Sequence, residues 1–167
     1  LQQSGSDDIV YTLDVPDEPQ QIACDRGLIN QALTNLLKNA AEAIQARLAA
    51  EPNGPAGEIR ARMMRAADSV VIEISDNGTG LPEADRERLM EPYVTTRAKG
   101  TGLGLAIVRK IVEQHGGTIA FEDAADGTLR GASVRVTLPA HGGAESPPSR
   151  KTPDVTENAT PVAQPGT

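Results

Sequence analysis

The sequence is poor in residue types on which several classes of protein depend. Aromatic residues make up only 2% of the chain and tryptophan is absent, so its core must consist of aliphatic side chains. The chain has one cysteine, Cys24, which excludes an intrachain disulfide and fits a reducing compartment. We expect Cys24 to be a small core residue. No apolar run reaches the roughly 18 residues that a membrane-spanning helix requires.

Positive charge is also scarce. The 16 Lys and Arg residues face 23 Asp and Glu residues, for a net charge of −7. Because a nucleic-acid-binding protein needs a basic face, this balance argues against a nucleic-acid partner.

A length of 167 residues suffices for one domain with a sizeable core. The chain starts at Leu1 rather than Met and shows no signal peptide, so we expect it to be cut from a longer protein.

The spacing of apolar residues predicts an α+β domain. Strands that come in adjacent pairs favour a mixed, mostly antiparallel sheet of about five strands, with about three helices on one face. The predicted elements are a strand at 9–15, a short strand at 21–24, a helix at 26–50 with Asp25 as its N-cap, a hairpin of strands at 59–63 and 70–74, a short helix at 82–90, a mobile loop at 91–101, a helix at 102–114, and strands at 119–121 and 132–138.

Composition divides the chain into three parts. We expect a frayed N-terminal segment at 1–7 and one domain at 8–139. Residues 140–167 contain five prolines and no apolar period, which is typical of a disordered tail.

Asp76 is the first candidate functional residue. It continues the parity of the apolar positions in the strand at 70–74, so its carboxylate should point into the sheet–helix interface, where burial is costly without a partner. The amino group of an adenine would be a suitable partner. Gly78 and Gly80 permit positive φ and close approach of a flat ring to the backbone. The alternative is a turn aspartate that caps the backbone of Asn77 and Gly78.

Asn35 and Asn39 form the second candidate feature. They lie four residues apart on the predicted helix and therefore share one face, which Glu42 extends. Asparagine is a poor residue for the middle of a helix. Its amide oxygen is a hard, neutral ligand that suits Mg²⁺. The alternative is a pair of amides on an exposed helix face.

The third feature is the glycine-rich segment 100–105 (GTGLGL), which opens a predicted helix. Its backbone N–H groups and the helix N-terminus suit an anion such as phosphate. Thr101 adds a hydroxyl, and Arg97 and Lys99 add positive charge. A flexible hinge is the alternative. The chain contains no P-loop or Rossmann motif.

The two histidines show no catalytic pattern. His115 precedes two glycines at the end of a predicted helix, where we expect it to act as a C-terminal cap. His141 falls in the predicted tail. No Cys/His cluster has the spacing of a zinc site.

The three features together resemble the N box (35–39, NLLKN), the G1 box (76–80, DNGTG) and the G2 box (100–105) of the GHKL superfamily. Residues 7–139 are similar to the catalytic and ATP-binding domain of bacterial sensor histidine kinases, and most similar to the nitrogen-regulation group of the NtrY and NtrB type. The segment 91–97 (EPYVTTR) resembles the short lid of that group, although the family's lid Phe is absent and Met90 and Tyr93 occupy its neighbourhood.

The resemblance implies a two-layer α/β sandwich, the Bergerat ATP-binding fold, with ATP and Mg²⁺ as cofactors. It implies that Asn35, Lys38 and Asn39 serve catalysis, that Asn39 ligates the metal, and that Asp76 binds adenine in a pocket shaped by Gly78 and Gly80. It places Asn35 beside the nucleotide's phosphates. The other residues that it assigns to this end of the nucleotide site are Arg97, Lys99, Gly100, Thr101, Gly102, Leu103, Gly104 and Leu105.

The function that the resemblance implies is transfer of the γ-phosphoryl group of ATP to a histidine on a helical hairpin upstream of this chain, for relay to a response regulator. The hydrolase branches of the superfamily (gyrase, Hsp90 and MutL types) carry Glu where this chain has Asn35, and Asn cannot act as a general base. The implied parent is a homodimer anchored in the bacterial inner membrane, with this domain in the cytoplasm. The alternatives are a nucleotide-responsive interaction module without chemistry, and a protein-serine kinase of the anti-sigma-factor type.

Overall fold

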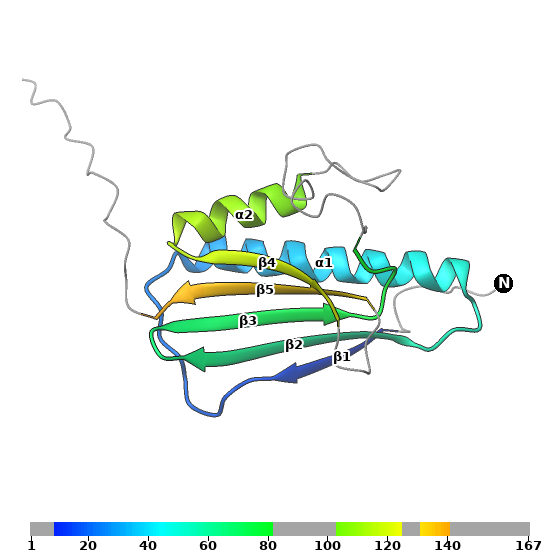
Figure 1. The fold of residues 1–167 in the computed structure, drawn as a ribbon, viewed down its shortest axis with the longest axis horizontal. Coiled ribbons are helices and arrows are strands. Elements are labelled where there is room, and N and C mark those ends of the chain that lie inside the picture. The colour runs from blue at the N-terminus through cyan, green and yellow to red at the C-terminus, as the bar shows by residue number, and fades with distance from the viewer. Residues whose placement is uncertain (1–8, 82–102, 125–130, 141–167) are drawn as a thin grey trace, which may run out of the picture.

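The computed structural model describes residues 9–81, 103–124 and 131–140. Within this part of the chain, a five-stranded sheet is covered on one face by two helices (Figure 1). The elements are β1 (Ile9–Asp14), α1 (Arg26–Ala50), β2 (Gly57–Ala66), β3 (Ser69–Asp76), α2 (Gly104–Gln114), β4 (Thr118–Asp123) and β5 (Ala132–Pro139).

The strands lie in the order β1-β2-β3-β5-β4, and only the β1–β2 pair is parallel. The predicted hairpin is confirmed, since β2 and β3 are antiparallel neighbours joined at Ala67 and Asp68. The predicted α+β fold class is likewise confirmed, and it places the helices together in a second layer (Figure 1).

Helix α1 begins and ends where the sequence predicts. Asp25 is its N-cap, and the side-chain oxygen Oδ1 accepts a hydrogen bond of 3.0 Å from the backbone N–H of Leu28. The helix runs for 25 residues to Ala50, and Pro52 follows two residues later. Because the helix is this long, it passes along the sheet and brings well-separated side chains to the same interface.

The core lies between the helix layer and the sheet, and it is aliphatic as expected. The largest fully buried side chains come from both helices and from β2 and β5, and they are Ile44, Ile59, Leu138, Val108 and Val112. This packing holds α1 and α2 side by side over the sheet, which determines where the start of α2 meets α1.

Two predictions about the segment before α1 are wrong. Residues 21–24 do not form a strand, because the chain there crosses from the edge of the sheet to the helix layer without a neighbouring strand to pair with. Cys24 is exposed rather than buried, and it borders an open hollow beside the start of α1 with Arg26 and Gly27.

The described residues contain two helices rather than about three, and the predicted helix at 82–90 and loop at 91–101 lie outside them.

Candidate nucleotide-binding site

Three segments that are distant in the sequence converge above the C-terminal end of β3. A Cβ atom built on Gly78, in the loop after β3, would lie 2.6 Å from the carbonyl carbon of Ala43 in α1. A Cβ atom built on Gly104, at the start of α2, would lie 3.7 Å from Nδ2 of Asn39. The middle of α1 therefore contacts both the loop after β3 and the first turn of α2.

Asp76 is the last residue of β3 and is only 4% exposed. Its Oδ1 accepts hydrogen bonds from the backbone N–H of Gly78 at 2.8 Å and of Ala132 at 3.4 Å. The turn-cap alternative is therefore present, and the carboxylate is buried as the strand parity predicts. Backbone donors fix its orientation, and a carboxylate held in this way can accept a hydrogen bond from an amino group.

Gly131 contributes to this arrangement, although the sequence analysis did not identify it. A Cβ atom at this buried position would clash with the carbonyl oxygen of Asp76 and would lie 2.5 Å from Oδ1. Only glycine lets the chain before β5 approach the aspartate so closely. The only signal in the sequence is a glycine directly before a predicted strand, which is too common to indicate a site.

The two glycines of the predicted base pocket act differently from each other. Gly80 adopts a φ of 76°, which L side chains rarely adopt. Gly78 is required for proximity rather than for its φ angle, since a Cβ atom there would also lie 2.8 Å from the backbone nitrogen of Ile44. It therefore lets the loop after β3 lie directly against α1.

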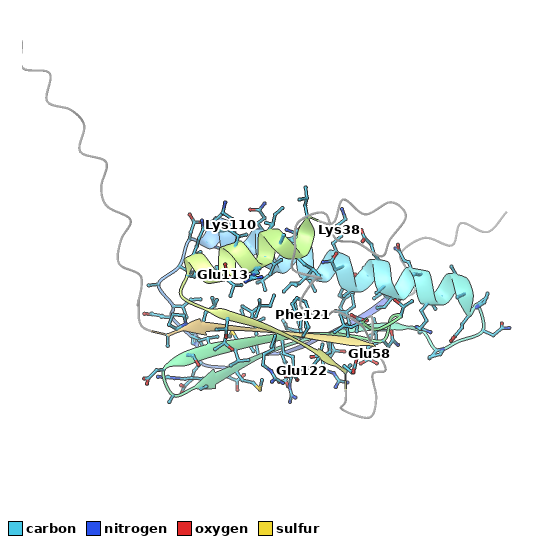
Figure 2. All side chains as sticks on the ribbon, turned by 45° about the horizontal axis from the view of Figure 1, so that its top comes forward. Lys38, Glu58, Lys110, Glu113, Phe121 and Glu122 are labelled. Carbon is cyan, nitrogen blue, oxygen red and sulfur yellow. The ribbon has the colours of Figure 1, made fainter. Side chains whose placement is uncertain are left out.

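Asn35 and Asn39 are half-buried on one face of α1, as expected from their spacing. Lys38 lies between them in the sequence but is 71% exposed, and its Nζ is 4.0 Å from Oε1 of Glu42. Figure 2 shows Lys38 on the side of the helix layer that faces away from the sheet. The structure thus places the Asn39 amide beside the start of α2, and the Lys38 ammonium group lies on the exposed side of α1.

The first turn of α2 is free of side-chain caps within the described residues. Leu103 is the N-cap residue, it forms no side-chain cap hydrogen bond, and no acidic residue occupies the first turn. Backbone N–H groups at such a helix end favour an anion. Of the residues expected at the phosphates, Leu103, Gly104 and Leu105 lie here, and Arg97, Lys99, Gly100, Thr101 and Gly102 lie outside the described residues.

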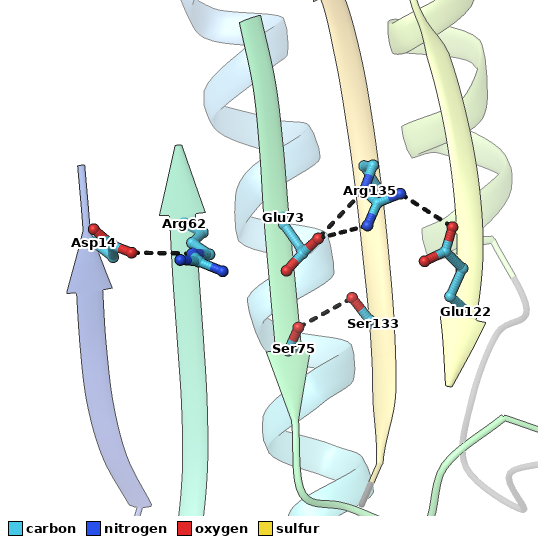
Figure 3. Close-up of polar contacts among 7 residues, drawn as sticks. All are labelled: Asp14, Arg62, Glu73, Ser75, Glu122, Ser133 and Arg135. Carbon is cyan, nitrogen blue, oxygen red and sulfur yellow. Dashed lines mark hydrogen bonds and ion pairs between the residues drawn. The ribbon is translucent and has the colours of Figure 1, made fainter. Parts of the chain in front are cut away.

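The opposite face of the sheet carries ion pairs (Figure 3). Arg135 contacts Glu73 at 2.9 Å and Glu122 at 3.1 Å across three strands. The hydrogen bond to Glu73, and then the charge of Glu122, raise the pKa of the Arg135 guanidinium, which stays charged. Partly exposed pairs of this kind contribute about 0.2–1 kcal/mol to stability. They join strands and lie away from Asp76 and the helices.

Two further properties concern metals and membranes. Within residues 9–81, 103–124 and 131–140, no group of three His, Cys, Asp or Glu side chains could hold a metal ion. None of the helices in the same ranges is both long and apolar enough to span a membrane.

A buried aspartate at a strand end, asparagines on the facing helix and an uncapped helix start in a two-layer sandwich define a nucleotide-binding domain of the Bergerat type. Residues 24–142 match the model of the family described as histidine kinase-, DNA gyrase B- and HSP90-like ATPases. The chain belongs to this family, and it is an ATP-binding domain of the histidine kinase type.

Relatives of known name agree with this assignment. The chain is 51% identical over 152 residues to the nitrogen regulation protein NtrY of Azorhizobium caulinodans, covering 91% of this chain and 19% of that protein. Among solved structures it is similar to the mycobacterial sensor histidine kinase MprB, with a TM-score of 0.67, 28% identity and coverage of 79% and 82% of the two chains. Full-length ShkA in complex with AMPPNP matches with a TM-score of 0.63, 26% identity and coverage of 78% and 25%. The chain spans about a fifth of the length of NtrY.

Proposed function

We propose that this chain binds Mg²⁺–ATP and, within a longer parent protein, holds the γ-phosphoryl group for transfer to a histidine on a helical hairpin of that parent. The observation that carries the proposal is Asp76, a carboxylate only 4% exposed that two backbone amides orient beside α1. Burying a carboxylate costs free energy unless it has hydrogen-bond partners. The amino group of adenine can donate such a hydrogen bond to it. The solved relative ShkA is in complex with AMPPNP, which supports a nucleotide at this fold.

The base and the phosphates would occupy different ends of the site. Asp76 would bind the adenine amino group, with Gly78 and Gly80 shaping the pocket. The first turn of α2 would face the phosphates with its backbone N–H groups. Arg97, Lys99 and residues 100–102 would extend this anion site.

Asn39 fits the metal role, because its amide oxygen is a hard neutral ligand beside the anion site formed by Gly104. Asn35, one turn earlier on the same face, would lie beside the phosphates, and Lys38 would add positive charge at the border. When bound, Mg²⁺ neutralises phosphate charge and stabilises the transition state of phosphoryl transfer.

We infer transfer rather than hydrolysis because Asn35 cannot take a proton from water. The parent would be a homodimeric sensor kinase that passes the phosphoryl group to a response regulator. Its anchoring in a membrane, with this domain on the cytoplasmic side, is part of the same proposal.

Supplying an acceptor tests the proposal directly. The 167-residue chain, labelled ATP and Mg²⁺ are incubated with a separately produced acceptor hairpin from a nitrogen-regulation kinase. We expect acid-labile label on the hairpin, as phosphohistidine gives. Acid-stable label would favour the serine-kinase alternative, and ATP binding without transfer would favour an interaction module. The same reaction with Asp76→Asn is the matched control and should lose most of the label.

A further inference from the structure

Arg47 lies near the C-terminal end of α1 and contacts the loop that leads into β2. Its Nη2 donates hydrogen bonds to the carbonyl oxygen of Pro55 at 2.8 Å and of Ala56 at 3.4 Å. The same nitrogen lies 3.5 Å from Oδ1 of Asn77, in the loop after β3. One guanidinium group therefore joins α1 to both loops that flank the strand pair β2–β3.

Asn77 is held from several sides, and each contact is to the start of β2 or to α1. Its Nδ2 donates to the carbonyl oxygen of Ala56 at 2.8 Å, and its Oδ1 accepts from the backbone N–H of Glu58 at 2.8 Å. Its backbone N–H donates to the carbonyl oxygen of Glu58 at 3.2 Å. The position of Asn77 thus depends on the segment 56–58, which Arg47 also holds at Ala56.

The neighbours of Asn77 are the two residues that shape the base end of the site. Asp76 precedes it, and Gly78 follows it and packs against the backbone of Ala43. Ala43 and Arg47 are four residues apart, which is about one helical turn. Helix α1 therefore fixes this short loop at two points, by contact at Gly78 and by the guanidinium of Arg47 at Asn77.

We propose that Arg47 is a positioning residue for adenine recognition, acting through Asn77 to hold Asp76 and Gly78 in place against α1. The inference rests on the proposed function, because it assumes that Asp76 contacts the base. In this proposal Arg47 contacts the loop, and Asp76 contacts the base.

The contacts of Arg47 favour a positional role over a stabilising one. Its Nε and Nη1 are buried and make no hydrogen bond within the described residues. A Cβ atom on Gly54 would lie 3.0 Å from Nη1, so the loop between α1 and β2 closes tightly over the guanidinium. Burying N–H groups without acceptors is unfavourable, and this cost offsets part of the stability that the hydrogen bonds of Nη2 contribute.

The test compares ATP with inosine triphosphate, which lacks the amino group that Asp76 would bind. In the full 167-residue chain, Arg47→Met should reduce the preference for ATP over inosine triphosphate by about three- to tenfold, as expected for one displaced hydrogen bond. Affinity for tripolyphosphate should stay the same, because the phosphate end is held by other residues. Arg47→Lys should restore part of the preference, since it keeps one donor.

Leu48→Ala is the matched control, because Leu48 is the next residue of α1 and packs against the core. It should lower the melting temperature and leave the nucleotide preference at the wild-type value. Asn77→Ala should reproduce the loss seen with Arg47→Met, and the double variant should add little, because both residues act through one contact.

Three outcomes overturn the inference. An undiminished preference for ATP in both Arg47→Met and Asn77→Ala would show that the loop does not need this support. An equal loss of preference in Leu48→Ala would show that general destabilisation is the cause. A wild-type chain that binds ATP and inosine triphosphate equally would overturn both this inference and the assignment of Asp76, whereas the first two outcomes leave the proposed function intact.

Discussion

Asp76 combines a structural and a proposed binding role in one carboxylate. Its Oδ1 accepts from the backbone of Gly78 and Ala132, and its near-complete burial leaves it inside the sheet–helix interface. The parity of the strand places the side chain there, but the close approach of Gly131 and Ala132 determines which way it faces. A change that keeps its volume and alters only its donors and acceptors is therefore the most informative one.

We expect Asp76→Asn to weaken ATP binding at least tenfold, which corresponds to about 1.4 kcal/mol. An amide can present its NH₂ donors to the amino group of adenine, where the carboxylate accepts. Titration calorimetry measures the change. Asp68→Asn, an exposed aspartate in the β2–β3 turn, is the control and should bind like wild type. Unchanged affinity in Asp76→Asn would remove the residue from the base site.

Asn39 tests the metal end of the site. Asn39→Ala should abolish Mg²⁺-dependent transfer to an acceptor hairpin, because it removes a proposed ligand, while the melting temperature stays near wild type because the side chain is only half-buried. Asn30→Ala makes the same chemical change at an exposed position of α1 and should keep full transfer. Full transfer by Asn39→Ala would show that the metal has other ligands.

At the scale of elements, α1 is the element on which the whole site depends. Asn35, Asn39, Ala43 and Arg47 follow one another at every fourth residue, so they form one stripe along the helix. The stripe spans about 18 Å at 1.5 Å per residue. Asn39 lies beside the start of α2, and Ala43 and Arg47 hold the loop after β3. A single rigid helix thus sets the distance between the proposed phosphate and base ends.

The first turn of α2 should respond to phosphates rather than to the base. Within the described part of the chain its backbone N–H groups have no side-chain cap, so a bound triphosphate would supply them with hydrogen-bond acceptors. Amide hydrogen exchange in residues 103–107 should slow when a non-hydrolysable ATP analogue and Mg²⁺ are added, and much less with adenosine. Residues of β4, which lies beside β5 at the far edge of the sheet, supply the internal control. Equal slowing with adenosine would contradict the assignment of α2 to the phosphates.

At the scale of the whole molecule, His115 joins the C-terminal end of α2 to the N-terminal end of α1. Its Nδ1 lies 2.7 Å from the carbonyl oxygen of Ile111, and its Nε2 accepts from the backbone N–H of Asp25 at 2.9 Å. The side chain thus caps the end of α2, as predicted, and also contacts the N-cap residue of α1. Both ring nitrogens are engaged, which makes this histidine a poor phosphoryl acceptor.

The chain alone should therefore neither autophosphorylate nor hydrolyse ATP at an appreciable rate. His115 is held by its two hydrogen bonds, and Asn35 offers no base to activate water. Incubation with γ-labelled ATP and Mg²⁺, followed by gel analysis and a phosphate-release assay, measures both reactions. The His115→Gln variant identifies any label on that residue. Stable label on His115, or steady phosphate release, would contradict this account of the acceptor.

The sequence alone determined the features that depend on local spacing. The helix from Arg26 to Ala50 follows from its apolar repeat and from Asp25 as N-cap, and the burial of Asp76 follows from strand parity. The shared face of Asn35 and Asn39 is likewise a property of one helix. In each case the signal comes from residues a few positions apart, and the described structure agrees with it.

The tertiary structure decided what depends on contacts between distant segments. The approach of Gly131 to Asp76, the link from Arg47 to Asn77 and the parallel pairing of β1 with β2 leave no periodic trace in the sequence. The exposure of Cys24 belongs to the same class, because burial depends on what packs against a residue and not on its own chemistry. Packing of the two helices on one sheet brings the loop after β3, the middle of α1 and the first turn of α2 together, because the contacts that hold them join residues far apart in the sequence.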